Sequence, residues 1–153
     1  MLISISLALC GDVHSNPGLV TFGIYHVNIR TLIGNKAQLE AEISVDQFHV
    51  VALTETRLDD NISDDDIKLT GFQSPFGKDR DRLGGGVAAY IRSNIAAVRL
   101  IDLDHPGIEA LWIETAVPKQ TLLIGIIYRP PNAPVVFWNT LYDIVENTNT
   151  VDH

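Results

Sequence analysis

The sequence is poor in cysteine and in positive charge. Cys10 is the only cysteine among 153 residues, so the chain can form no internal disulfide and no zinc site built on cysteines. Lys and Arg number 11 against 19 Asp and Glu, which gives a formal net charge of −8 at pH 7. Proteins that bind nucleic acid through phosphate contacts alone are normally basic. Either the protein binds no nucleic acid, or it does so through a local basic strip and a metal ion held by carboxylates.

Long apolar runs are missing as well. The first nine residues, MLISISLAL, are mostly apolar, but a membrane span needs about 20 such residues. A run of this length suits the apolar part of a secretory signal, although no Lys or Arg precedes it. A signal peptide is therefore the weaker interpretation, and the cellular compartment stays open. The composition, 46% hydrophobic and 20% charged, is that of a globular domain.

What the sequence does contain is a series of short apolar segments separated by turn residues. Residues 22–29 (FGIYHVNI) and 48–53 (FHVVAL) are rich in β-forming side chains, which predicts two buried strands. Asn35 can cap a helix over residues 36–44 between them. A strand, a helix and a strand at this spacing predict a crossover connection that covers the outer face of a sheet.

The second half of the chain adds a strand, a hairpin and a helix. After a polar surface-loop region at 59–83, a strand is predicted over 87–91, and strands over 108–115 and 121–128 are predicted to pair as a hairpin. The last predicted helix covers residues 135–146. Its core candidates are Val136, Trp138, Leu141 and Val145. Five strands and two helices together predict an α/β fold with its helices outside.

Three polar residues stand at the carboxyl ends of apolar strands: Asn28, Glu55 and Tyr128. Ligands of α/β sheets bind at such ends, because side chains there leave the core. A carboxylate and an amide oxygen that converge at a sheet end can hold Mg²⁺. Taken alone, Asn28 is better explained as a turn or cap residue, and Glu55 as a solvent-facing strand end or a first-turn acid. Only their combination indicates a site.

Three sequence contexts around these residues are more specific. HVNIRTL at 26–32, VVALTETRL at 50–58 and LLIGIIYRPPN at 122–132 resemble, in order and spacing, the opening motifs of the endonuclease/exonuclease/phosphatase family. The nearest subgroup is the endonuclease domain of non-LTR (LINE-type) retrotransposons. The segments GKDRDRLGGGVAAYIR at 77–92 and GIEALWIE at 107–114 also resemble that subgroup. Five motifs that occur in the same order argue against a chance resemblance.

The resemblance implies a fold class and roles for the site residues. Residues 22–153 are expected to form part of a four-layer α/β/β/α sandwich, of the α/β (α+β) class. By this resemblance Glu55 ligates the catalytic Mg²⁺ or Mn²⁺, and Asn28 positions the metal-bound or phosphate-facing part of the site. Tyr128 corresponds to the tyrosine that hydrogen-bonds a phosphate oxygen, and Arg129 is a second candidate phosphate contact.

Arg30 distinguishes between subgroups of the family. Members that repair abasic sites carry an acid two residues after the asparagine, whereas the retrotransposon subgroup has N-x-R-S-L, which NIRTL fits. Arg30 is accordingly expected to contact substrate, and DNA is the expected partner of the full-length parent protein. The implied reaction is in-line attack of an activated water on a DNA phosphodiester, at the site where the element nicks its target.

Later motifs of the family are absent. The sequence has no Gly-Asp-Phe-Asn strand, no downstream aspartate motif and no Ser-Asp-His ending. Asp152-His153 is not taken as that ending, because it stands before the position at which even the Gly-Asp-Phe-Asn strand is expected. The carboxyl-terminal portion of the domain is thus expected to be missing, and the chain alone is expected to have no nuclease activity. Two alternatives remain: a non-catalytic binding or interaction module retained by a host, and a family phosphatase acting on a phospholipid or inositol phosphate. NIRTL and YRPPN disfavour the phosphatase.

The first 21 residues are interpreted as a separate leader. GDVHSNPGL at 11–19 resembles the ribosome-skipping peptides of viruses and some retrotransposons, which end in D-x-E-x-N-P-G followed by proline. His14 replaces the glutamate and Leu19 replaces the proline, so skipping is expected to fail. The motif nevertheless points to a retrotransposon origin.

A truncated sandwich raises a further expectation about association. If the chain supplies mainly one sheet, the inner apolar face of that sheet is left partly uncovered. Exposed apolar faces of this kind drive association. Self-association through this face, with poor solubility, is therefore expected.

Overall fold

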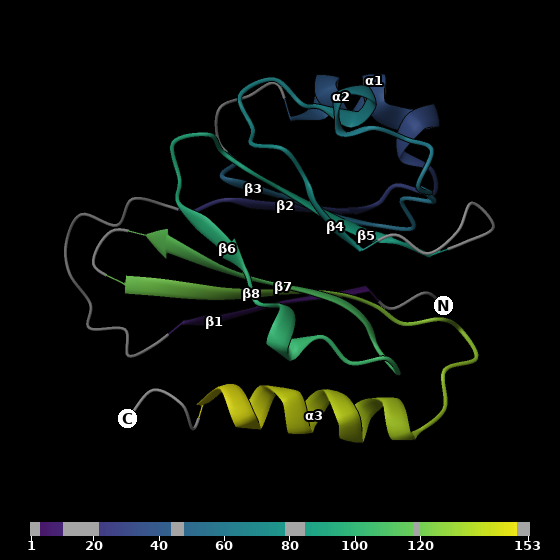
Figure 1. Ribbon diagram of the computed structural model, residues 1–153, viewed down its shortest axis with the longest axis vertical. Coiled ribbons are helices and arrows are strands. Elements are labelled where there is room, and N and C mark those ends of the chain that lie inside the picture. The colour runs from purple at the N-terminus through teal and green to yellow at the C-terminus, as the bar shows by residue number, and fades with distance from the viewer. Residues whose placement is uncertain (1–3, 11–21, 44–47, 79–84, 118–119, 150–153) are drawn as a thin grey trace.

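A computed structural model describes residues 4–10, 22–43, 48–78, 85–117 and 120–149. These residues form a mixed α/β fold with two four-stranded sheets and three α-helices (Figure 1). The GDVHSNPGL segment and the residues 79–84 and 118–119 lie outside the described part. None of the described helices is long and apolar enough to cross a membrane.

The first sheet has the strand order β2-β3-β5-β4. Its strands are β2 (Ile24–Asn28), β3 (Val50–Thr54), β4 (Phe76–Lys78) and β5 (Val87–Ile91). β2 and β3 run parallel, and α1 (Leu32–Glu42) forms the crossover between them. β5 is antiparallel to both of its neighbours. Every residue of β3 and β5 is buried, as expected for strands covered on both faces.

The second sheet is antiparallel, with the strand order β1-β8-β7-β6. Its strands are β1 (Ser4–Cys10), β6 (Ala97–Arg99), β7 (Glu109–Val117) and β8 (Gln120–Tyr128). The predicted hairpin is present as β7 and β8, in a register that pairs Glu109 with Tyr128. β1 comes from the apolar leader, whose pairing with β8 the sequence did not indicate.

The two sheets pack against each other through a shared apolar core. This core contains Val50 and Ala52 of β3, Leu111 of β7, and Ile124 and Ile126 of β8, and the two sheets face each other in Figure 1. The expectation of an uncovered inner face is therefore wrong for the described residues. Its premise failed because β1, β6 and the hairpin together build a second sheet, which covers the first. The expected self-association was based on that uncovered face, so the described fold gives no support for it.

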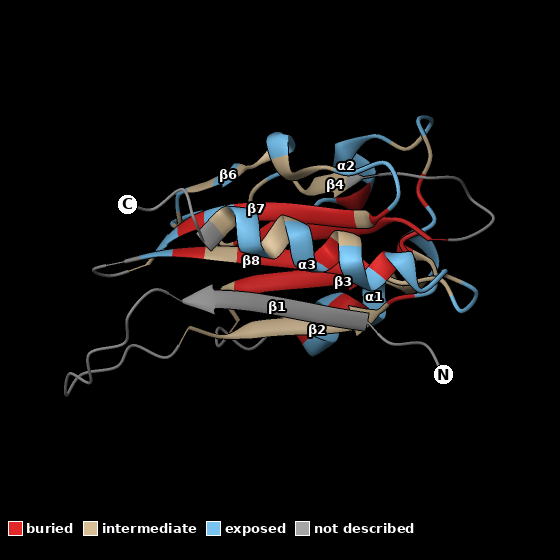
Figure 2. Cartoon of the chain, turned by 90° about the horizontal axis from the view of Figure 1, so that it is seen from below, coloured by how far each residue is buried: buried red, intermediate tan, exposed pale blue. Residues whose placement is uncertain are grey.

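Helices lie on the two outer surfaces. The first sheet buries Val51 and Leu53 against Leu32 and Leu39 of α1, together with Ile67 of α2 (Asp64–Ile67). The second sheet is covered by α3 (Val136–Asn149). A short 3₁₀ turn at Ile101–Leu103 lies between β6 and β7 in the chain. Figure 2 shows buried residues along β3, β7 and β8 and exposed residues on the outer surface of α3.

The buried face of α3 differs from the predicted one. Phe137 and Leu141 are buried, with Val145 packed against them, whereas Val136 and Trp138 are 58% and 39% exposed. Leu141 and Val145 were thus correct core candidates, and Val136 and Trp138 were wrong. The helix docks on β7 and β8 through positions spaced at i, i+4 and i+8 from Phe137, and this spacing turns both wrong candidates outward.

Other element boundaries also need correction. α1 begins at Leu32 after Thr31, not at Lys36, and Asn35 lies inside it. The Asn35 side chain donates from Nδ2 to the Ile29 carbonyl at 2.8 Å, which ties the helix to the end of β2. The region 59–83 is not only a surface loop, because it contains α2 and β4 and the buried Phe72.

Candidate functional site

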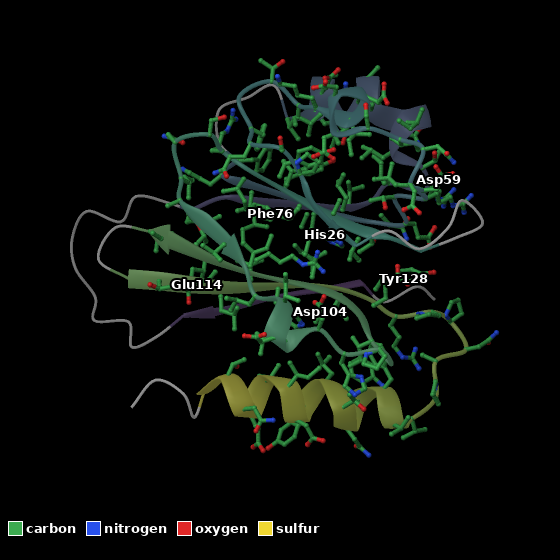
Figure 3. The ribbon with its side chains drawn as sticks, viewed as in Figure 1. His26, Asp59, Phe76, Asp104, Glu114 and Tyr128 are labelled. Carbon is green, nitrogen blue, oxygen red and sulfur yellow. The ribbon has the colours of Figure 1, made fainter. Side chains whose placement is uncertain are left out.

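The carboxyl ends of β2, β3 and β8 meet at one end of the paired sheets. Asn28 is the last residue of β2, Glu55 directly follows β3, and Tyr128 is the last residue of β8. The two sheets are connected there, because the Gly86 backbone N–H donates to Oε1 of Glu109, the register partner of Tyr128. Figure 3 shows Tyr128 and Asp59 at this end and Glu114 at the opposite end.

Alternation along the strands turns several polar side chains toward the space between the sheets. In β2, Ile24 packs into the shared core, so His26 and Asn28 lie on the same face. Tyr128 belongs to that core and is 7% exposed. Glu109 shares the face of Leu111 by the same rule. An imidazole, an amide, a carboxylate and a phenol thus line one end of the intersheet space.

Glu55 is a nearly buried carboxylate whose recorded partner within the described residues is one arginine. Its side chain is 10% exposed, and its Oε2 lies 3.8 Å from a guanidinium nitrogen of Arg57. Among the described residues, this ion pair is the contact recorded for the Glu55 carboxylate. A buried carboxylate is costly unless it is paired, hydrogen-bonded or bound to a metal ion. The single long ion pair leaves room for a cation.

Left-handed backbone conformations cluster after these strands. Within the described residues, the non-glycine residues with positive φ are Arg30 at 61°, Glu55 at 55° and Arg57 at 52°. Gly85 and Gly86, at 78° and 89°, face the same turn and accept hydrogen bonds from the Arg57 and Thr56 N–H groups. Such conformations are costly for L-residues and concentrate at functional sites. Their presence here singles out this end of the molecule.

The two arginines expected to contact substrate lie differently. Arg30 is exposed and follows Asn28 by two residues, at the same end of the first sheet. Arg129 points away from the intersheet space: one of its guanidinium nitrogens donates to the Ala133 carbonyl at 3.2 Å. Its guanidinium carbon lies 5.5 Å from the centre of the Trp138 ring. The structure therefore places the Arg30 backbone at the site end of the first sheet, whereas the Arg129 side chain is engaged by Ala133 and Trp138.

The other end of the first sheet carries a separate hollow of about 380 Å³. Its lining residues are Phe48, His49, Gly71, Arg92, Ser93 and Asn94. Nε of Arg92 donates to the Phe48 carbonyl at 2.8 Å, and the guanidinium lies 4.3 Å from the centre of the Phe72 ring. Arg92 is thus held at the end of the sheet opposite to Asn28 and Glu55.

Glu109 and His26 are site residues that the sequence analysis did not single out. A signal existed for Glu109, because it lies two and four residues before Leu111 and Ile113. A carboxylate on the apolar face of a predicted strand predicts a buried partner, because a buried charge without one is costly. His26 carries the same kind of signal, lying two residues after Ile24 within an apolar segment.

His26 should make the stability of the protein depend on pH. Burial lowers the pKa of His26 below its ordinary value of 6.5, because desolvation penalises the charged imidazolium. The unfolded chain then binds the proton more tightly, so stability is lost as pH falls from about 6.5 through the lower folded pKa. Urea denaturation of His26→Gln between about pH 5 and 7.5 should show a weaker loss than that of the wild type. Equal losses in both proteins would rule out His26 as the cause.

Asn28 and Glu55 have the chemistry that a hard divalent cation prefers. Oδ1 of Asn28 is buried and accepts no hydrogen bond among the described residues, and Glu55 offers a carboxylate with one long ion pair. The described residues contain no group of three or more His, Cys, Asp or Glu side chains placed to hold a metal ion. Mg²⁺ is commonly bound by one or two carboxylates with several waters and substrate phosphates. The two oxygen donors therefore fit Mg²⁺ better than they fit a cation that needs a full protein cage.

Comparison with known proteins adds no assignment. No family model matches the chain, and no curated protein matches it.

Proposed function

We propose that the chain belongs to a metal-dependent phosphodiesterase domain of the endonuclease/exonuclease/phosphatase type, of the kind that nicks DNA for non-LTR retrotransposons. The observation that carries this proposal is the meeting of Asn28, Glu55 and Tyr128 at one end of two facing sheets. The two sheets with helices on both outer surfaces support the finer proposal of a four-layer α/β/β/α sandwich.

Each residue of this end has a task suited to its surroundings. Glu55 would hold Mg²⁺ or Mn²⁺, which when bound polarises a phosphodiester and activates water. Asn28 would orient the same region through its buried amide oxygen. The Tyr128 hydroxyl would donate to a non-bridging phosphate oxygen and stabilise the charge that develops there. Arg30, exposed beside them, would meet the DNA backbone.

The chain alone is proposed to bind the metal without cleaving DNA. No Gly-Asp-Phe-Asn or Ser-Asp-His motif occurs in its sequence, so the residues that would accept the water proton have no counterpart. Loss of a general base and of a second acid removes several orders of magnitude in rate. Metal binding, rather than turnover, is therefore the property to test first.

The proposal predicts a divalent-cation site that depends on Glu55. Mn²⁺ should broaden the NMR signals of the Asn28 side-chain amide and the Glu55 backbone amide, because a paramagnetic ion relaxes nearby nuclei. Glu55→Gln should weaken this binding at least about tenfold, since it removes the carboxylate charge while keeping its shape. Glu114 is an exposed glutamate of the same chain, so the control variant Glu114→Gln should bind Mn²⁺ as the wild type does.

A nicking assay separates the outcomes. With Mg²⁺ and supercoiled plasmid, the chain should leave the plasmid intact. Nicking that is lost in Glu55→Ala would overturn the proposed inactivity but support the family. Absence of Mn²⁺ broadening in the wild type would count against the phosphodiesterase proposal and favour the non-catalytic interaction module.

A further inference from the structure

We propose that Glu109 is the positioning residue of the Glu55 site and acts on it from the opposite sheet. This inference deepens the proposed function and rests on it for its metal-binding part. Glu109 begins β7, in register with Tyr128, whereas Glu55 follows β3 in the other sheet. A carboxylate that connects the two strand ends can fix their relative placement, which neither sheet fixes alone.

The first contact of this connection is the hydrogen bond from the Gly86 N–H to Oε1 of Glu109. Gly86 precedes β5, just outside the last ladder pair of Thr54 with Val87. Its N–H is directed at the second sheet rather than at β3. A charged acceptor makes a shorter and stronger bond to a backbone N–H than a neutral one does. Glu109 thus holds the start of β5 against the second sheet.

The second set of contacts passes from the glycines to the turn after β3. The Thr56 N–H donates to the Gly86 carbonyl at 3.3 Å, and the Arg57 N–H donates to the Gly85 carbonyl at 3.1 Å. A Cβ on Gly86 would lie 2.3 Å from Oγ1 of Thr56, so the two segments are in close contact. Any displacement of Gly86 must therefore move residues 56 and 57.

The last step is the conformation of Glu55 itself. Glu55 and Arg57 both hold left-handed φ values, 55° and 52°, which a free L-residue disfavours. Such a conformation persists only where the surroundings over-determine it. The hydrogen bonds of residues 56 and 57 to the glycine pair supply that constraint, and Glu109 anchors the glycine pair. Glu109 is therefore placed to decide where the Glu55 carboxylate lies.

A variant series at position 109 tests this path. Glu109→Ala removes the acceptor, Glu109→Asp withdraws it by one methylene, and Glu109→Gln keeps an oxygen in place. Glu114→Ala is the matched control, because Glu114 lies on the same strand at the opposite end (Figure 3). We expect the Ala and Asp variants to speed hydrogen exchange of the Gly86, Thr56 and Arg57 amides by about tenfold or more. The Gln variant should restore slow exchange.

Two spectroscopic readouts separate positioning from a merely structural role. The ¹³Cα and ¹³Cβ shifts of Glu55 report its φ, and they should move in the Ala and Asp variants but not in the Gln or Glu114 variants. Mn²⁺ affinity should fall by about tenfold in the same two variants, the lower end of the loss that outer-shell partners cause. If Glu109→Ala does not fold, the Asp and Gln pair decides alone.

Each failure has its own meaning. Unchanged exchange and unchanged Glu55 shifts in the Asp variant would overturn the inference. Faster hydrogen exchange with unchanged Glu55 chemical shifts and unchanged Mn²⁺ affinity would mean that Glu109 only stabilises the fold. That result would also overturn the inference. A wild type that binds no Mn²⁺ would defeat the proposed function instead, while exchange and ¹³C shifts, which need no metal, would still decide the role of Glu109.

Discussion

Replacing Trp112 with alanine is expected to lower the free energy of unfolding by about 3–5 kcal/mol, the usual cost of truncating a fully buried Trp or Phe. Trp112 is 1% exposed and packs on the outer face of the second sheet against Ile127 and Phe137. Its ring lies over Gly125, where a Cβ would fall 2.5 Å from a ring carbon. With no side chain at Gly125 to fill the space, the cavity left by the substitution cannot close.

The indole nitrogen makes the comparison with phenylalanine informative. Nε1 of Trp112 is buried and donates to no described group, and an unmade buried hydrogen bond costs about 1–3 kcal/mol. Trp112→Phe removes that donor while keeping an aromatic ring, so its cost should be well below that of Trp112→Ala. Urea denaturation followed by circular dichroism measures both.

Trp138 supplies a matched control for this prediction. It lies on α3, is 39% exposed and makes an edge contact with Phe137. Trp138→Ala should cost no more than about 1.5 kcal/mol, the upper range for one aromatic pair. Equal losses at positions 112 and 138 would mean that α3 does not cover the second sheet as described.

Local sequence patterns predicted the central elements well. β5 was predicted at its observed bounds, and the hairpin of β7 and β8 was predicted within two residues at each end. These segments are apolar runs bounded by turn residues, so their signals lie within the segments themselves. What failed depends on distant partners. β1, β4 and β6 are strands because β8, β5 and β7 pair with them, and no local pattern marks that pairing.

The candidate site was predictable in part for the same reason. Strand ends can be read from a sequence, so Asn28, Glu55 and Tyr128 were found as the residues that close apolar runs. The placement of Glu109 depends on hairpin register and on how two sheets face each other, and both are properties of the assembled fold. The left-handed backbone at Glu55 could not be predicted from a local glycine. The glycines that stabilise it are Gly85 and Gly86, about 30 residues later in the chain.

Gly86→Ala should be the most damaging conservative substitution at the candidate site. Gly86 has a φ of 89°, and an added Cβ would lie 2.3 Å from Oγ1 of Thr56. The left-handed conformation costs an L-residue about 1–2 kcal/mol, and forced overpacking costs about 1–3 kcal/mol more. We therefore expect the free energy of unfolding to fall by about 2–5 kcal/mol. Gly107→Ala is the control: Gly107 is exposed and lacks a positive φ, and an added Cβ would meet only the exposed His105 ring, 3.2 Å away. Because that ring can move into solvent, stability should change by no more than about 0.5 kcal/mol.

The double variant Thr56→Ala/Gly86→Ala separates the two causes. Oγ1 of Thr56 is buried and has no hydrogen-bond partner among the described residues, so its removal sacrifices no such bond. Without that oxygen, the alanine at 86 keeps its conformational cost but loses the clash. The double variant should then be more stable than Gly86→Ala alone, by about 1–3 kcal/mol in a urea double-mutant cycle. Strict additivity of the two changes would mean that Oγ1 of Thr56 does not clash with a Cβ at position 86, and the path from Glu109 to Glu55 would lose the close contact at its middle step.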